Sequence, residues 1–320
     1  ARARELRINP DLGAAIGIDF GFRTVRLLVT DLAAGELARS ERRLGEHYSA
    51  EEGLGAIAAM LDETVPASGG LRSRLVAAGI ALPGPVDTGR QSVIGSAVLP
   101  GWSNVTAHDL ESAVGVPVVL ENDANLAALG EHVYGAGRGS RDSLTVKFHS
   151  GVGAGIIVGD RLVTGRAGGA GEIGHTLVDP RGPLCRCGKR GCLDTYAAVP
   201  AVLDAMSAVH PELGLPGFLD LVHAQDPGAL RVARDAADLV GRALGAATLL
   251  LAPERIILVG ALARAGDVMV AAVRDALAQS VLPDTAPPEV VLGELGDRHT
   301  AMGAVARALE FAGWLPMGTN

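Results

Sequence analysis

The three cysteines of this 320-residue chain, Cys185, Cys187 and Cys192, lie within eight residues of one another. So tight and odd-numbered a cluster argues against a disulfide framework and for a metal site. Together with His175 they supply three thiolates and one imidazole, the Cys₃His set of a closed tetrahedral zinc site. We therefore predict a structural zinc, because four protein ligands leave no position open for catalysis. Three buried free thiols, with the histidine elsewhere, are the alternative.

Two polar residues just upstream of this cluster could bind a hydroxylated ligand. If zinc takes one ring nitrogen of His175, the other nitrogen points in a fixed direction and could meet a hydroxyl. Glu172 lies three residues earlier and could accept a second hydrogen bond. As an alternative, Glu172 is only a solvated turn residue, and the spacing leaves both interpretations open.

A second polar group, Glu121-Asn122-Asp123, follows an apolar run and precedes a segment with helical character. Asp123 could act as the general base that accepts a proton from a substrate hydroxyl. It could instead be the helix N-cap, a position that aspartate favours. Sequence spacing alone does not decide between these roles.

A glycine-rich run, Gly151-Val-Gly153-Ala-Gly155, is a weak nucleotide-binding signal. It is not the dinucleotide fingerprint, because Ile occupies position 156, and no Gly-Lys-Ser/Thr follows as a P-loop requires. NAD-dependent and P-loop enzymes are therefore poor fits to this sequence.

Alternating strands and helices are expected to position these residues. Apolar and periodic segments predict strands at 14–19, 25–30, 75–82, 116–120, 144–148, 156–158, 161–163 and 255–259, and helices at 50–65, 124–132, 231–251 and from about 301. This order indicates an α/β fold, in which active sites lie at the carboxyl ends of strands. Residues that follow a predicted strand are Asp19, Gly84, Asp123, Gly151 and Gly260.

The length and composition indicate a globular chain of about two domains. We expect a linker remnant at 1–13, a first domain at 14–134 completed by a C-terminal helix at about 301–320, and a second at 135–300. The net charge of −8 and the lack of an extended basic patch argue against DNA binding by these residues. No apolar stretch is long enough to span a membrane. The few clustered cysteines favour a cytoplasmic location.

Three motifs resemble those of the ROK family, which contains repressors, uncharacterised reading frames and sugar kinases. They are LPGWSN at 99–104, ENDAN at 121–125 and GEIGHTLVDPRGPLCRCGKRGCLDTY at 171–196, and the resemblance extends from about Ala14 to Gly313. It implies an actin-like, ribonuclease H-like fold of two α/β domains around a cleft, with a zinc loop. It further implies a homodimer or homotetramer that uses a surface of the second domain.

The resemblance also implies a set of sugar-binding residues. These are Gly84, through the backbone of the Pro-Gly-Pro loop, and the side chains of Asn104, Asn122, Asp123, Glu172, His175 and Asp194. Position 194 holds Asp where Glu is usual in the family. The side chain is one methylene shorter, which could alter the choice of sugar.

The nucleotide side of the family pattern is changed in this chain. The kinase branch carries Asp-x-Gly-Gly-Thr in its first phosphate loop. Here Phe22 replaces the second glycine, and Arg23 replaces the threonine with its hydroxyl. A bulky side chain at this point should block a triphosphate. Val259-Gly260-Ala261 also stands where Gly-Gly-Gly is usual. The remnants of the nucleotide loops are Asp19, Gly21, Thr24, Ser150, Gly151, Gly153 and Gly260.

An intact sugar site beside an eroded nucleotide site is typical of the repressor branch. We therefore expect the effector-binding and oligomerisation region of a sugar-responsive transcriptional regulator, which would bind DNA through a helix-turn-helix module upstream of this chain. The alternative is an ATP-dependent, glucokinase-like sugar kinase in which Asp123 is the base and Asp19 helps to hold Mg-ATP. A sugar-binding relic without a DNA-binding module is a third possibility.

Overall fold

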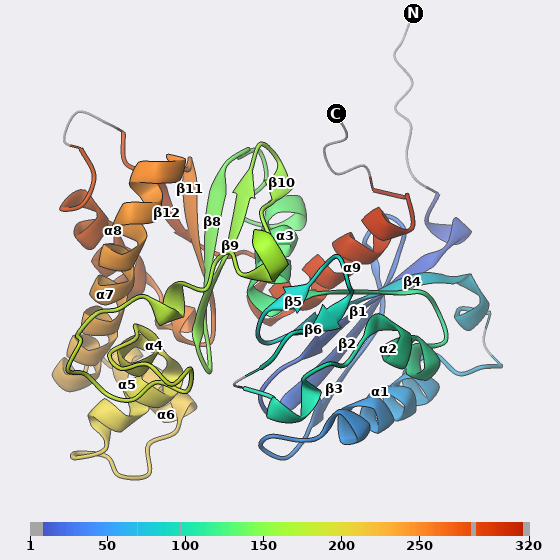
Figure 1. Cartoon of the computed structure of the whole chain (residues 1–320), viewed down its shortest axis with the longest axis horizontal. Coiled ribbons are helices and arrows are strands. Elements are labelled where there is room, and N and C mark those ends of the chain that lie inside the picture. The colour runs from blue at the N-terminus through green and yellow to red at the C-terminus, as the bar shows by residue number, and fades with distance from the viewer. Residues whose placement is uncertain (1–8, 69, 97, 283–285, 316–320) are drawn as a thin grey trace, which may run out of the picture. The chain divides into compact units, whose positions relative to one another are not determined.

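The computed structural model describes residues 9–68, 70–96, 98–282 and 286–315 and divides the chain into two compact units (Figure 1). The first unit contains Ala1–Leu126 and Thr300–Asn320, and the second contains Ala127–His299. The predicted linker remnant lies outside the described residues as far as position 8, as do residues 316–320 of the expected C-terminal helix.

The first unit is built on a five-stranded mixed sheet with the order β3-β2-β1-β4-β7. Its strands are β1 (Ala14–Phe20), β2 (Thr24–Asp31), β3 (Glu36–Arg43), β4 (Leu75–Leu82) and β7 (Val118–Asn122). The first three form an antiparallel meander, while β4 and β7 are parallel to β1. The carboxyl ends of β1, β4 and β7 therefore lie at one edge of this sheet.

Two helices and a small ribbon complete one side of this unit. Helices α1 (Ala50–Thr64) and α2 (Ala107–Val114) each begin at a capping box, in which the cap side chain and the third helical residue bond to each other's backbone N–H. The ribbon pairs β5 (Val86–Asp87) with β6 (Ser92–Val93). Apolar side chains of α1 and of the sheet share one buried core.

Helix α9 (His299–Phe311) packs against β1 and β4 of the first unit. An ideal Cβ on Gly17 would lie 2.1 Å from the carbonyl oxygen of Ala301, and one on Gly79 would lie 1.9 Å from that of Ala304. Only glycine can occupy these two strand positions at such a close backbone approach. The end of the chain therefore covers strands formed near its beginning.

The second unit contains another five-stranded sheet, with the order β10-β9-β8-β11-β12. Its strands are β8 (Ser143–Phe148), β9 (Val152–Val158), β10 (Arg161–Leu162), β11 (Arg255–Gly260) and β12 (Glu289–Leu292). The predicted hairpin turn at Gly159-Asp160 is confirmed, and both residues have the positive φ angles, 59° and 63°, of a type I′ turn.

Helices cover this second sheet. They are α4 (Asp194–Ala197), α5 (Val199–Met206), α6 (Leu215–His223), α7 (Pro227–Leu251) and α8 (Asp267–Ala278). These helices and inward residues of β8 and β11 form the larger core. Helix α3 (Asp123–Tyr134) begins in the first unit and continues into the second, where its Ala127 packs on Ile257 and Val259.

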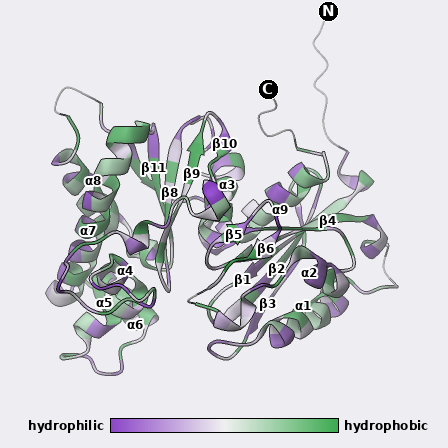
Figure 2. Ribbon diagram, viewed as in Figure 1, coloured by the Kyte–Doolittle hydropathy of each residue, from purple (hydrophilic) through white to green (hydrophobic). Residues whose placement is uncertain are grey.

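Short 3₁₀ turns link these elements at Pro10–Leu12, Arg72–Arg74, Pro100–Trp102, Arg166–Gly168, Ile173–His175, Leu262–Ala265 and Gly296–Arg298. Hydrophilic residues interrupt the outer helices, including α1 and α8 (Figure 2). Across the described part of the chain, we find no helix with the length and apolar character needed to cross a membrane.

Candidate functional site

The four predicted metal ligands lie together in the second unit. The ligand atoms of His175, Cys185, Cys187 and Cys192 are all within 4.8 Å of one another. The Sγ of Cys185 lies 3.7 Å from Nδ1 of His175, and the Sγ atoms of Cys187 and Cys192 are 3.6 Å apart. A tetrahedron with metal–sulfur bonds of about 2.3 Å has edges of roughly 3.8 Å. The side chains are therefore spaced as ligands of one tetrahedral ion.

The environment of the thiols also fits a cation. Burial raises the pKa of Cys185 and raises that of Cys192 to about 12, whereas a hydrogen bond from the backbone N–H of Lys189 lowers the pKa of Cys187. Two buried thiolates and a third close to them repel one another unless a positive charge lies among them. A bound divalent metal supplies that charge, and its binding would release the thiol protons.

The backbone around the cysteines forms a tight double turn. The N–H of Cys185 donates to the carbonyl of Lys189 at 2.7 Å, which closes the first turn. Gly191 has φ of +66°, and an ideal Cβ there would lie 1.5 Å from the carbonyl oxygen of Asp179. No other residue could occupy position 191 without moving the loop. The loop is thus shaped by its own backbone, which places four potential metal ligands together.

Glu172 and His175 lie side by side, as their spacing predicts. Nδ1 of His175 faces the cysteines, and Nε2 lies 3.9 Å from a carboxylate oxygen of Glu172. About a third of each side chain is exposed, with values of 32% for His175 and 37% for Glu172. The imidazole can therefore bind a metal with one nitrogen while the other nitrogen and the carboxylate remain accessible.

Asp194 begins α4 and lies against the turn between β8 and β9, which we call the second glycine-rich loop because Gly151 lies in it. Its Oδ1 accepts the backbone N–H of Val152 at 2.8 Å, and its Oδ2 lies 3.6 Å from Nη2 of Arg186. The same Nη2 donates to the carbonyl of Ser150 at 2.5 Å. Gly151 directly precedes β9, in which Val152 and Gly153 are the first two residues. The structure thus brings Asp194 next to the second loop as well as to the cysteine cluster.

In the first unit, Asn122 rather than Asp123 caps helix α3. The side-chain Oδ1 of Asn122 accepts the N–H groups of Ala124 and Asn125 at 2.8 and 3.1 Å, and its Nδ2 donates to the carbonyl of Gly84 at 3.0 Å. The capping role considered for Asp123 is thus filled by its neighbour. Asp123 lies in the first helical turn and is only partly buried.

Glu121 supports this turn and was missed by sequence reasoning. Its side chain is fully buried, and its Oε1 accepts the N–H of Asn122 at 2.8 Å and Nδ2 of Asn125 at 3.0 Å. Burial raises the pKa of Glu121. A charged residue within the buried strand β7 was the available signal, since such residues are rarely buried without a partner.

Asn104 lies on an exposed loop that is anchored by a buried tryptophan. Its φ is +69°, a left-handed conformation that asparagine tolerates, and its N–H donates to Val93 at 2.9 Å. Trp102 is fully buried; its ring centroid lies 4.5 Å from that of Phe20, and Nε1 donates to the carbonyl of Tyr48 at 3.3 Å. The packing of Trp102 therefore fixes the loop that carries Asn104.

The loop between β1 and β2, predicted to be the first phosphate loop, is held by contacts of its own side chains. The rings of Phe22 and His47 are in edge contact at 5.3 Å, and the guanidinium of Arg23 lies 5.5 Å from the centre of the Phe22 ring. Arg23 also forms an ion pair with Glu46. The N–H of Gly21 donates to the carbonyl of Thr24 at 2.8 Å, which closes the turn. The loop is therefore stabilised by its own side chains and backbone.

Asp19 at the end of β1 is buried, with one carboxylate oxygen 3.5 Å from Nη1 of Arg26. The hydroxyl of Tyr48 donates to the carbonyl of Gly21 at 2.9 Å. Burial, with a smaller effect of Asp19, raises the pKa of Tyr48, so this hydroxyl keeps its proton. Tyr48 thus connects the loop at Gly21 to Trp102, whose ring also packs on Phe20.

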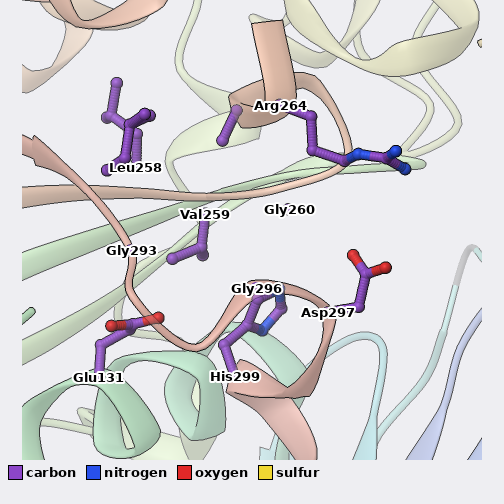
Figure 3. Close-up of a pocket in the computed structure, with 11 residues that line it drawn as sticks. Glu131, Leu258, Val259, Gly260, Arg264, Gly293, Gly296, Asp297 and His299 are labelled. Carbon is purple, nitrogen blue, oxygen red and sulfur yellow. The ribbon is translucent and has the colours of Figure 1, made fainter. Parts of the chain in front are cut away.

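A pocket of about 170 Å³ opens at the carboxyl ends of β11 and β12 in the second unit (Figure 3). Arg264, Asp297 and His299 lie around it, with Gly260 between them, and Val259 and Glu131 also line it (Figure 3). Sites for drug-sized ligands usually exceed about 300 Å³. The volume of this pocket is thus below that range.

Glu131 in this pocket is a structural residue that the sequence did not reveal. It is fully buried, and its carboxylate accepts the backbone N–H groups of Ala136, Glu294 and Leu295 at 2.8, 3.0 and 3.1 Å. The N–H of Ala136 would be a buried donor without this partner if the carboxylate were lost, and the other two N–H groups would lose the same acceptor. Glu131 therefore ties the turn after α3 to the loop after β12.

The two sheets, with this order of strands and helices, define the class of the protein as the actin-like α/β fold of sugar kinases. A solved glucokinase from Streptomyces griseus, in complex with glucose and AMPPNP, superimposes with a TM-score of 0.82. The two sequences are 29% identical, and the superposition includes 93% of this chain and 100% of the glucokinase chain.

The chain belongs to the ROK family, whose family description matches residues 15–310. The glucokinase of Thermotoga maritima is 33% identical over 245 residues, which are 71% of this chain and 77% of that protein. The xylose repressor of Bacillus spizizenii is 27% identical over 95% of this chain and 79% of its own length. Both repressors and kinases are therefore among its relatives.

Proposed function

We propose that this chain is the effector-binding and oligomerisation region of a sugar-responsive transcriptional regulator. The observation that carries the proposal is the first phosphate loop, where Phe22 packs on His47 and Arg23 pairs with Glu46. A phosphate bound at a loop needs close approach to backbone N–H groups, and Phe22 and Arg23 are larger than the residues of the kinase pattern at these two positions. The residues proposed to bind sugar are all present.

The proposed sugar ligands are the residues that the family resemblance implies. They are the backbone at Gly84 and the side chains of Asn104, Asn122, Asp123, Glu172, His175 and Asp194. Sugar hydroxyls both donate and accept, so carboxylates, amides and an oriented imidazole suit them. The Oδ1 of Asn122 already accepts two N–H groups at the start of α3, and Nδ2 donates one of its two hydrogens to Gly84. Asn122 would therefore contact a sugar through the second hydrogen of Nδ2.

The metal in this proposal is zinc, with a structural role. The Cys₃His set and its tetrahedral spacing fit that ion. Through His175, zinc would orient the ring nitrogen that faces Glu172, so metal and sugar sites share a side chain. Sugar binding would then shift the balance between two conformations in a homodimer or homotetramer and change the spacing of upstream DNA-binding modules.

A glucokinase-like enzyme is the second candidate function, and one observation favours it. Oδ1 of Asp19 is buried and has no hydrogen-bond partner in the described part of the chain, so it keeps an acceptor that could serve Mg-ATP. Asp123 would then act as the base on the sugar hydroxyl. The glucokinases among the relatives agree with this candidate.

An assay with Mg-ATP separates the two functions. We expect no turnover of glucose, xylose or N-acetylglucosamine in a coupled assay and at most marginal ATP binding by calorimetry, because Phe22 and Arg23 occupy the phosphate loop. The double variant Phe22→Gly with Arg23→Thr should bind ATP more tightly than the wild type. Sugar binding by the same samples controls for folding. Wild-type turnover within the usual kinase range of about 1–100 per second would establish the kinase instead.

A further inference from the structure

Arg186, between the first two cysteines of the metal loop, joins that loop to two other parts of the second unit. Its Nη2 donates to the carbonyl of Ser150 in the second glycine-rich loop at 2.5 Å and lies 3.6 Å from Oδ2 of Asp194. The side chain is 38% exposed, whereas that of Asp194 is only 11% exposed. A single guanidinium thus faces both a backbone carbonyl and a nearly buried carboxylate.

The two oxygens of Asp194 have different surroundings. Oδ1 accepts the N–H of Val152 at 2.8 Å and is committed to the backbone. Oδ2 faces Arg186 at a distance longer than a hydrogen bond, so it is held by charge and keeps its capacity to accept a hydroxyl. A sugar that reaches Asp194 would therefore be recognised through Oδ2.

The carboxylate also has little room to turn. An ideal Cβ on Gly174 would lie 2.2 Å from Oδ1 of Asp194, and one on Gly151 would lie 3.3 Å from Oδ2. Backbone thus lies against both sides of the carboxylate, and Arg186 is the cation that faces Oδ2. The planar guanidinium can serve the carbonyl of Ser150 and the carboxylate together, which a lysine ammonium on a flexible stem does less well.

We propose that Arg186 is a positioning residue, which aims Oδ2 of Asp194 at one hydroxyl of the bound sugar and thereby contributes to the choice of sugar. This inference rests on the proposed sugar-binding function. It assigns Arg186 a task apart from the metal, although the residue lies between two metal ligands. Removal of Arg186 should therefore weaken only the hydrogen bond that one sugar hydroxyl donates to Asp194.

Calorimetry on Arg186→Ala, Arg186→Lys and Asp194→Asn tests this, with Arg190→Ala as the matched control. Arg190 belongs to the same loop but donates to Gly182 at 3.3 Å, away from Asp194. Using the tightest binder among glucose, xylose and N-acetylglucosamine, we expect Arg186→Ala to weaken binding roughly five- to tenfold. Arg186→Lys should recover part of this loss, and Arg190→Ala should bind as the wild type does. Zinc content should stay at one per chain throughout.

The monodeoxy analogues of that sugar provide a readout that a purely structural role would not move. One analogue should bind the wild type more weakly than the parent sugar does, because it lacks the hydroxyl that contacts Asp194. The variant Arg186→Ala should bind this analogue as tightly as the wild type does. The double variant with Asp194→Asn should likewise lose less than the two single losses added together.

Three results would overturn the proposal. If Arg186→Ala weakens every analogue equally, or loses zinc in proportion to affinity, then Arg186 only supports the loop. If its loss and that of Asp194→Asn add fully, the two residues act independently. In these cases the wild type still binds sugar, and the proposed function stands. If the wild type binds none of the three sugars, both the function and this inference fail.

Discussion

Replacing Cys187 with serine is expected to remove the zinc and to lower the melting temperature by about 10 °C. The loss of a metal is among the few single changes that cost more than about 4 kcal/mol. A change of about 1 kcal/mol shifts the melting temperature of a unit of 150–250 residues by roughly 2–4 °C. Because Cys187 shares its ion with His175, sugar affinity should fall as well. Metal analysis, calorimetry and thermal unfolding measure these three effects.

Addition of zinc provides the control for this experiment. Wild-type protein stripped with a chelator should regain its metal, its stability and its sugar affinity when zinc is added back. The serine variant should not recover, because three remaining ligands hold the ion less firmly. Wild-type protein that is purified without chelator and contains no metal would contradict the proposed zinc site.

Asp123→Ala is expected to weaken sugar binding by roughly ten- to a hundredfold, since a hydrogen bond to a charged group contributes about 1.5–3 kcal/mol. Capping of α3 should survive, because Asn122 supplies it. Asp267→Ala is the matched control, as it removes another first-turn aspartate, from α8. Both variants should lose a similar small amount of stability from the helix dipole, about 0.3–1 kcal/mol.

Calorimetry with hexoses, pentoses, N-acetylated amino sugars and their phosphates separates the two variants. Only Asp123→Ala should lose affinity, and in the regulator this loss would blunt the response to sugar without changing DNA binding in its absence. If both variants bind sugar as the wild type does, Asp123 serves only the helix, and the effector site lies elsewhere.

The sequence predicted most of the buried strands of this fold, because they are apolar runs that stop at a turn residue. An exception is β9, which begins at Val152, four residues before the strand predicted at 156–158, so that most of the glycine-rich run is strand. The sequence did not predict β3 (Glu36–Arg43), which is largely exposed at the edge of its sheet and carries a polar sequence. Such a strand exists because β2 pairs with it through the backbone, a tertiary effect that residue pattern does not carry. The short strand β12 and the helices α2, α4 to α6 and α8 were not predicted either.

The candidate site divides in the same way. The cluster of His175 with the three cysteines was predictable. The cysteines fall within eight residues, and such tight spacing is typical of a metal site rather than of disulfides. The capping by Asn122, the backbone clamp of Glu131 and the contacts of Arg186 were not predictable, since each depends on partners distant in sequence or on the rotamer chosen. The sequence motifs therefore identified the candidate residues, whereas their hydrogen-bond partners became known only from the packed structure.

The close contact of α9 with Gly17 and Gly79 has a consequence for the order of events during translation. Strands β1 and β4 leave the ribosome early, but the helix that covers them is made only after residues 127–299, the whole second unit. At about 5–20 residues per second this interval lasts roughly 10–30 s. The second unit, a continuous stretch of chain, can fold within that time. Until α9 emerges, one face of the nascent first sheet stays open to chaperones or to misassociation.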